Sequence, residues 1–347
     1  MRKHVKDSGE MLPAINRRDL LLTAGSAVAG AALTGLLASQ VSAQQGGSPA
    51  EALINTVKNA RLFDLSHTWD ENSPIAGVNP PYSMELNAAH APKADNPKGT
   101  RGMFGDGGQL SFTSEVQAWS GQHGAPSIDA LGHIGHNGAL FGGVDAARAT
   151  SDPRGIGRSG VGAHLGIDHY PLDLLVNRGV LLDVAQFIQG NRNPLPPGFE
   201  ITARHLADTA AAQKVALKRG DTVLIRTGWG RHFTGDPAQY KGDASPGPGV
   251  DGARFLIANG ARVVGNDTLT FEKRPPIAGT PNTPSFQVFP VHMLLISDNG
   301  INIIENFFLE EIAAAQSYEF LLVVPPLKIR GGTGSALRSF ALASSRP

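Results

Sequence analysis

The sequence has 347 residues, of which 30 are basic and 30 are acidic, so its formal net charge is zero. A neutral chain without a basic surface is not expected to bind nucleic acid. The absence of cysteine excludes disulfide bonds, thiolate metal ligands and a cysteine nucleophile. The length allows about two domains or one large α/β domain.

The first 43 residues have the pattern of an export signal. A basic leader ends at Arg17-Arg18, an apolar run extends through Leu37, and Val41-Ser42-Ala43 has the small-x-small form of a cleavage site. An arginine pair directly before a mildly apolar run is typical of the twin-arginine pathway. We therefore expect residues 1–43 to engage the twin-arginine export machinery and deliver a periplasmic or secreted protein. The alternative is an uncleaved membrane anchor.

After a short polar linker at residues 44–49, residues 50–347 show no second linker and no repeat, which predicts a single domain. Apolar runs bounded by turn residues predict strands, and helical patterns separate them. The predicted strands cover residues 179–184, 222–226, 262–265 and 320–324, and the predicted helices cover 202–213, 251–259 and 305–316. This alternation predicts an α/β fold with a mixed sheet and a helical layer. Residues 75–108 are expected to form a long loop that could cover a site.

Three metal-binding side chains lie within a dozen residues rich in glycine and proline. They are His123, Asp129 and His133. Imidazole and carboxylate are the ligands that Zn or Mn takes when no thiolate is present. An irregular segment can fold three such groups onto one point, whereas a regular helix at these spacings would not. The alternative is a histidine in a turn and an aspartate that caps a helix.

A second pair of candidates is His292 and Glu305. The Asn299-Gly300 turn between them predicts a chain reversal that brings Glu305 back beside His292. Glu305 follows an apolar strand, so we expect it to be buried, and a buried carboxylate needs a cation or a proton. The alternative role is a glutamate at a helix N-terminus.

Two further residues follow predicted strands at their carboxyl ends, where α/β proteins form their sites. Trp229 could contact an aromatic substrate, and Asp267 could bind the substrate as well. Core packing is the alternative for Trp229, and a side-chain-stabilised turn is the alternative for Asp267. The glycine-rich segment 331–335 lacks the lysine of a phosphate loop and is interpreted as a tight turn.

A series of short motifs along the chain resembles one known family. In chain order they are Phe63-Asp64-Leu65-Ser66-His67, the segment 177–183, the segment 220–229, Gly265-Asn266-Asp267-Thr268, His292 with Glu305-Asn306, and Gly331-Gly332-Thr333-Gly334-Ser335. Together they resemble the cyclase superfamily of metal-dependent hydrolases, whose members include bacterial kynurenine formamidase and isatin hydrolase. The resemblance implies a swivelling β/β/α domain with a central mixed, barrel-like sheet. It also implies a homo-oligomer, either a dimer or a tetramer.

The metal motif of that family is H-x-G-T-H-x-D-x-P-x-H. Aligned on Asp129, its first and last histidines fall on His123 and His133, while its middle histidine falls on Ser127. The resemblance therefore implies that His123, Asp129 and His133 bind a divalent metal. We expect His292, oriented by Glu305, to shuttle protons between water and the leaving nitrogen in catalysis, or to complete a second metal position. Serine at the middle position is a departure from the family pattern.

These observations predict a metal-dependent hydrolase that acts on a C–N bond of an amide, formamide or lactam through water activated by Zn or Mn. The substrate is a small molecule. Two alternatives remain open at this stage. One is an exported, non-catalytic protein that binds a small ligand and has lost tight metal binding together with the middle histidine. The other is a metal-assisted lyase or cyclase.

Overall fold

Strands with hydrophobic residues on both faces build the centre of this protein. The computed structural model describes residues 48–75, 77, 79–105 and 109–344. The chain divides into two units, residues 1–58 and 59–347. The predicted signal and most of the predicted linker lie outside the described residues, and the described part of the first unit contains helix α2 (Pro49–Lys58). Among the described residues, no helix combines the length and apolarity that crossing a membrane requires.

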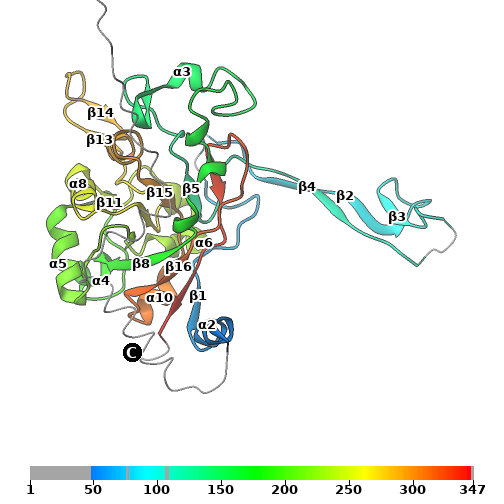
Figure 1. Cartoon of the computed structure of the whole chain (residues 1–347), viewed down its shortest axis with the longest axis horizontal. Helices are drawn as coiled ribbons and strands as arrows, with labels where there is room; N and C mark the ends of the chain where they lie inside the picture. Colours follow the sequence, from blue (N-terminus) through cyan, green and yellow to red (C-terminus); the bar gives the residue numbers. More distant parts are fainter. Residues whose placement is uncertain (1–47, 76, 78, 106–108, 345–347) are drawn as a thin grey trace, which may run out of the picture. The chain divides into compact units, whose positions relative to one another are not determined.

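Nine strands of the second unit form one mixed, strongly curled sheet that resembles half of a barrel (Figure 1). In spatial order they are β1 (Arg61–Asp64), β18 (Phe340–Ala343), β16 (Glu319–Val323), β8 (Val176–Asp183), β10 (Thr222–Arg226), β12 (Val263–Asn266), β15 (Asn302–Glu305), β5 (Ser127–Asp129) and β17 (Gly334–Ala336). The four central strands from β8 to β15 are parallel, and the flanking strands pair antiparallel. The predicted α/β class with a mixed, barrel-like sheet is confirmed.

Alternate residues of the central strands enter two separate hydrophobic cores, because successive side chains of a strand point to opposite faces. Leu181, Leu224 and Ile304 belong to one core. Val180 and Ile303 belong to the other core, which also contains residues of the covering helices. A sheet buried on both faces gives continuous apolar runs, which is why these strands were predictable from the sequence.

The helices and smaller sheets surround this central sheet. The α-helices are α3 (Ala146–Ala149), α4 (Val184–Gln189), α5 (Ala203–Gln213), α6 (His232–Gly235), α7 (Pro237–Lys241), α8 (Val250–Ala258), α9 (Pro290–His292) and α10 (Glu310–Ala314). Shorter 3-10 helices cover Phe141–Gly143, Ala163–Leu165, Ile167–His169, Leu172–Leu174 and Trp229–Arg231, and a π-helix covers Met293–Ser297. Small two-stranded sheets pair β6 (Ala139–Leu140) with β7 (Val144–Asp145), β9 (Glu200–Ile201) with β11 (Gly247–Pro248), and β13 (Ile277–Ala278) with β14 (Gln287–Val288).

Two predicted elements differ from the structure. The segment 75–108 is not a continuous loop, because it contains β2 (Ser83–Pro92) and β3 (Gly99–Arg101), which form a three-stranded sheet with β4 (Ser114–Ala118). The helix expected over 305–316 is limited to α10, because Glu305 still belongs to strand β15. The chain needs an irregular segment there to pass from the sheet to the helix.

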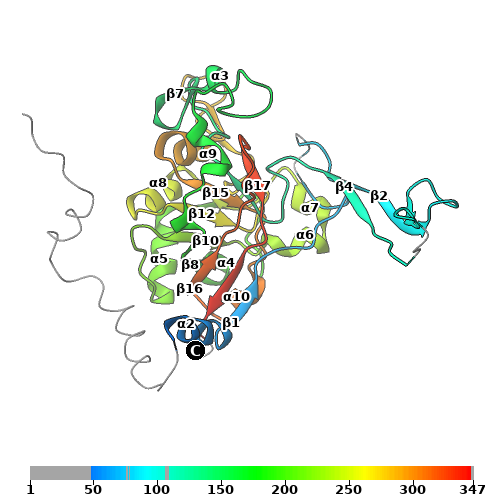
Figure 2. The ribbon, with the colours of Figure 1, turned by 45° about the vertical axis from the view of Figure 1, so that its right-hand side comes forward.

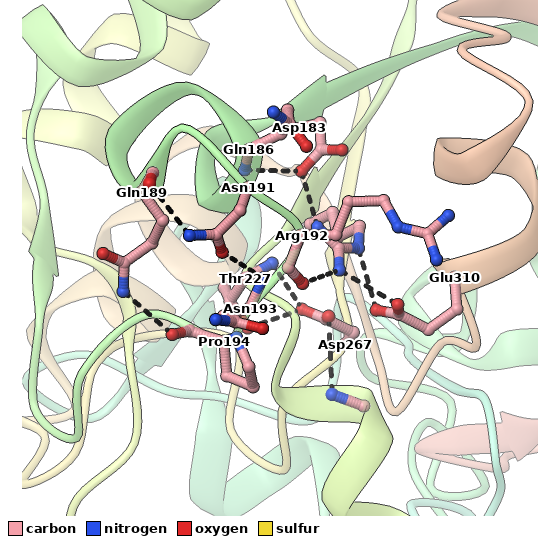
Figure 3. A network of polar contacts seen from close by, with 12 residues as sticks. Asp183, Gln186, Gln189, Asn191, Arg192, Asn193, Pro194, Thr227, Asp267 and Glu310 are labelled. Carbon is pink, nitrogen blue, oxygen red and sulfur yellow. Dashed lines mark hydrogen bonds and ion pairs between the residues drawn. The ribbon is translucent and has the colours of Figure 1, made fainter.

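A buried network of ion pairs joins the ends of β8 and β10 to α10 (Figure 3). Arg226 is fully buried and donates to Asp183 Oδ1 at 2.8 Å and to Glu310 Oε1 at 2.8 Å. Asp183 also accepts the backbone N–H of Gln186 and so caps α4. Glu310 receives a second cation, Arg231, at 2.7 Å. The network therefore fixes the positions of the loops that follow both strands.

Replacing Arg226 with methionine is expected to destabilise the protein by about 3–5 kcal/mol, because the change leaves the buried carboxylate of Asp183 without its cation and removes one of the two cations that pair with Glu310. Chemical denaturation of the purified variant measures this loss. Arg338→Met is the control, since its pair with Asp64 lies at the surface and should contribute little. Equal stability of the two variants would contradict the assigned importance of the network.

Candidate metal centre

One group of three side chains in the described part of the chain could hold a metal ion. The ligand atoms of Asp129, His292 and Glu305 all lie within 4.8 Å of one another. His292 Nε2 is 3.2 Å from Glu305 Oε1 and 4.0 Å from Asp129 Oδ2. The chain reversal predicted between His292 and Glu305 is therefore present, and it brings both residues to Asp129.

Strand register explains why two of these side chains meet. In the antiparallel pair of β5 and β15, Glu305 lies directly opposite Ser127. Asp129 is two residues further along β5, so it points to the same face as Ser127. This is the face of the helix layer, because Ile303, two residues before Glu305, belongs to the core of that layer. Helix α9, which contains His292, lies beside α8 (Figure 2), and its residue Val291 belongs to the core of the helix layer.

A third buried carboxylate group binds the far side of the histidine ring. His292 Nδ1 donates to Glu272 Oε1 at 2.6 Å, and Glu272 also accepts the backbone N–H groups of Val291 and His292. Glu272 is 1% exposed. The sequence analysis missed this residue, because it lies in an irregular segment whose sequence contains no motif. Its contact with His292 depends entirely on tertiary structure.

The charges of this cluster are unbalanced. One imidazole, His292, faces three carboxylates, those of Asp129, Glu272 and Glu305. Burial lowers the pKa of His292, but the hydrogen bonds that its ring donates to Glu272 and Glu305 outweigh this effect and raise the pKa to about 10. Burial, with the charge of Asp129, raises the pKa of Glu305 to about 7. Bound protons thus offset part of the negative charge, and a divalent cation would do so more fully.

His123 gives an independent test of whether a metal suits these residues. Its side chain is fully buried, yet neither ring nitrogen has a hydrogen-bond partner. Buried polar atoms are nearly always satisfied, so such a ring indicates a missing ligand. Burial lowers the pKa of His123, which keeps the ring neutral and able to coordinate a metal. The donor set of carboxylates and imidazoles therefore fits Zn or Mn.

The other predicted ligands, His123 and His133, do not belong to the group of three. His133 Nε2 lies 3.8 Å from Asp129 Oδ1, and about a third of its side chain (32%) is exposed. Ser127, at the position of the missing histidine, is buried beside Asp129 on the same strand. The individual roles assigned to His123, Asp129, His133, His292 and Glu305 stay predictions.

Trp229 and Asp267 are both buried and have partners inside the protein. Trp229 belongs to a small hydrophobic core that also contains Tyr240, and its ring N–H donates to the carbonyl of Tyr240. Asp267 accepts the backbone N–H and the hydroxyl of Thr227 at 2.8 and 2.7 Å. Burial raises the pKa of Asp267 to about 6. Their proposed contact with substrate stays a prediction.

Both residues nevertheless contact Tyr240, whose hydroxyl lies 3.4 Å from the carbonyl oxygen of Asp267. Tyr240 belongs to the same small hydrophobic core as Trp229, and its hydroxyl donates to the side chain of Asn306 at 2.8 Å. Asn306 follows Glu305 and donates in turn to the carbonyl of Gly124, next to His123. A chain of buried hydrogen bonds thus supports both segments that carry candidate ligands.

This fold and site define a class of protein. A family described as "Putative cyclase" matches residues 63–273, more than half of the sequence, so the chain belongs to this family. Isatin hydrolase from Roseibium aggregatum is 31% identical over 151 residues, which is 42% of this chain and 53% of that protein. The match thus spans about half the length of this curated relative.

Solved structures extend the similarity to most of the chain. The crystal structure of a novel cyclase has a TM-score of 0.67 and 27% identity, and the match covers 85% of this chain and 93% of that one. Isatin hydrolase A from Labrenzia aggregata, bound to benzyl benzoate, has a TM-score of 0.61, with 86% and 100% covered. At 22% sequence identity, this structural match shows that the two proteins share a fold.

Metal binding is expected to strengthen as pH rises, because the cation must displace the proton that His292 holds below its pKa of about 10. With one proton released per ion, the apparent affinity for Zn or Mn should rise about tenfold per pH unit. Calorimetric titrations at several pH values, in buffers of different ionisation enthalpy, measure both affinity and proton release. A pH-independent affinity without proton release would contradict this expectation.

Proposed function

We propose that this protein is a metal-dependent hydrolase that cleaves a C–N bond of an amide, formamide or lactam. The observation that carries the proposal is the buried group of Asp129, His292 and Glu305, whose excess negative charge suits a divalent cation. Family membership supports it, and the curated relative is an isatin hydrolase. Isatin contains a lactam, so the substrate class agrees with that relative.

The burial and contacts of each residue indicate its proposed role. Asp129, His292 and Glu305, with His123 as a further imidazole, would hold Zn or Mn. When bound, the ion would supply an activated water and a Lewis acid for the substrate carbonyl. With Nδ1 bonded to Glu272 and Nε2 presented to the metal, His292 would have no ring nitrogen free for proton transfer, so we propose that it is a ligand and not the proton carrier expected from the sequence. The partly exposed His133 can accept a proton and return it to the leaving nitrogen.

Ser127 favours a second candidate function. The family motif places a histidine there, and a buried serine contributes a weaker ligand. A protein with this change could bind a small ligand in the same place without catalysis. A metal-assisted lyase or cyclase would use the same residues but would not add water to its product. Analysis of the product therefore distinguishes all three.

We propose that the protein acts outside the cytoplasm. The support is the Arg17-Arg18 pair before the apolar run, and both lie outside the described residues. We also propose a homo-oligomer. Strands β2 and β4 carry exposed hydrophobic side chains, including Met84, Leu86 and Val116, and a second copy of the chain would remove them from water.

Purified protein with its signal removed, assayed for metal content and for hydrolysis of isatin and N-formylkynurenine, tests the proposed function. We expect about one Zn or Mn per chain and a product that has gained water. A chain that cannot be loaded with either metal, or that leaves amides and lactams unchanged when loaded, would overturn the proposal.

Asp129→Ala and His133→Ala should separate metal binding from proton transfer. Loss of Asp129 is expected to abolish metal binding and activity together. Loss of His133 should lower kcat by about 10²–10⁴-fold while the metal content stays unchanged. If His133→Ala loses its metal, His133 is a ligand and not the proton carrier.

Ser127→His should raise the affinity for Zn or Mn, because it adds an imidazole on the strand face that carries Asp129, opposite Glu305. Competition with a chelator measures the change. Ser297→His, on the π-helix, is the control for adding a histidine at another buried position. An unchanged affinity in a folded Ser127→His variant would mean that residue 127 does not face the metal.

A further inference from the structure

We infer that Glu272 is the positioning residue that fixes the ring of His292 and presents its Nε2 atom to the metal. The inference rests on the proposed metal function and deepens it. Glu272 does not belong to the group of Asp129, His292 and Glu305, and no motif of the sequence includes it. It acts on the metal centre through the opposite side of the imidazole ring.

Three hydrogen-bond donors converge on this one carboxylate. Oε1 accepts from the ring Nδ1 of His292 at 2.6 Å and from its backbone N–H at 3.0 Å, and Oε2 accepts the backbone N–H of Val291 at 3.3 Å. The two backbone donors lie in the first turn of α9, so they fix the carboxylate itself. The third bond then sets the orientation of the ring.

The Nδ1 bond has a defined chemical consequence. Because Nδ1 donates its proton to Glu272, Nε2 is the nitrogen that remains for a metal, and it is the atom nearest to Glu305 and Asp129. Without Glu272, the ring could rotate or place its single proton on Nε2. A carboxylate behind a metal-bound histidine also makes the ring a stronger ligand.

A cavity of about 440 Å³ reaches Glu272. It is lined by Glu272, Pro290, Val291, Lys273 and Glu200, among others, and by none of the three grouped residues. Lys273 is paired with Glu200 at 3.4 Å and places a positive charge in this cavity. A small carboxylate could therefore enter the space that a truncated Glu272 leaves and meet the same three donors.

Glu272→Ala is expected to lower the affinity for Zn or Mn about 10–100-fold. Glu272→Gln should lower it less, because the amide oxygen can still accept the Nδ1 proton. Added formate should restore most of the affinity in Glu272→Ala and should have no effect on the wild-type protein. Glu200→Ala is the matched control, since it removes a carboxylate from the same cavity without touching His292.

A second measurement does not need the metal. In metal-free wild-type protein, proton NMR should show a downfield, slowly exchanging Nδ1 proton of His292, identified by its absence in His292→Gln. This signal should be lost in Glu272→Ala and kept in Glu200→Ala. Persistence of the signal in Glu272→Ala would overturn the inference. An unchanged metal affinity in folded Glu272→Ala would also overturn it, and so would a loss of affinity that formate does not reverse. If the wild-type protein binds no metal, the proposed function fails, and the Nδ1 signal alone decides the role of Glu272.

Discussion

The concentration of carboxylates around one buried imidazole is the constraint on which the rest of this site depends. Asp129, Glu272 and Glu305 all approach His292, and none of the three can leave water without compensation. Protons supply part of this compensation in the metal-free protein, since the pKa values of His292 and Glu305 are both raised. The cluster is costly for a fold without a ligand and suited to one with a divalent cation.

The sheet and the helix layer supply this cluster from separate parts of the chain. Strands β5 and β15 bring Asp129 and Glu305 to one face through their register, and α9 brings His292 over that face. Glu272 comes from the irregular segment after β12. Each contribution is placed by backbone hydrogen bonds or by packing, so the donor atoms are arranged before any ligand binds, as a metal site requires.

The opposite face of the sheet has its own polar network, centred on Arg226. Leu224 belongs to the core of that face, so Arg226, two residues later, points the same way. Its pairs with Asp183 and Glu310 fix the loops at the carboxyl ends of β8 and β10. In that network the charges are matched within the protein, whereas around His292 they are not. This contrast separates a structural ion-pair network from a candidate functional site.

The sequence by itself determined the fold class and most of the central elements. The strand predicted over 222–226 coincides with β10, and the helix predicted over 202–213 differs from α5 by one residue. These elements were predictable because strands buried on both faces and capped amphipathic helices leave local patterns. The same local patterns singled out Asp129, His292 and Glu305 as chemical candidates.

Only the tertiary structure decided which candidates meet. Glu272 and His292 are 20 residues apart in the sequence, with the paired strands β13 and β14 between them, and their 2.6 Å contact leaves no periodicity or motif in the sequence. The strands β2 and β3 within residues 75–108 were missed because β2 is mostly exposed and β3 has only three residues, so neither has the continuous apolar run by which the central strands were predicted. Local sequence patterns record burial and turns, whereas the distance between side chains from different segments depends on strand register and packing of the whole chain.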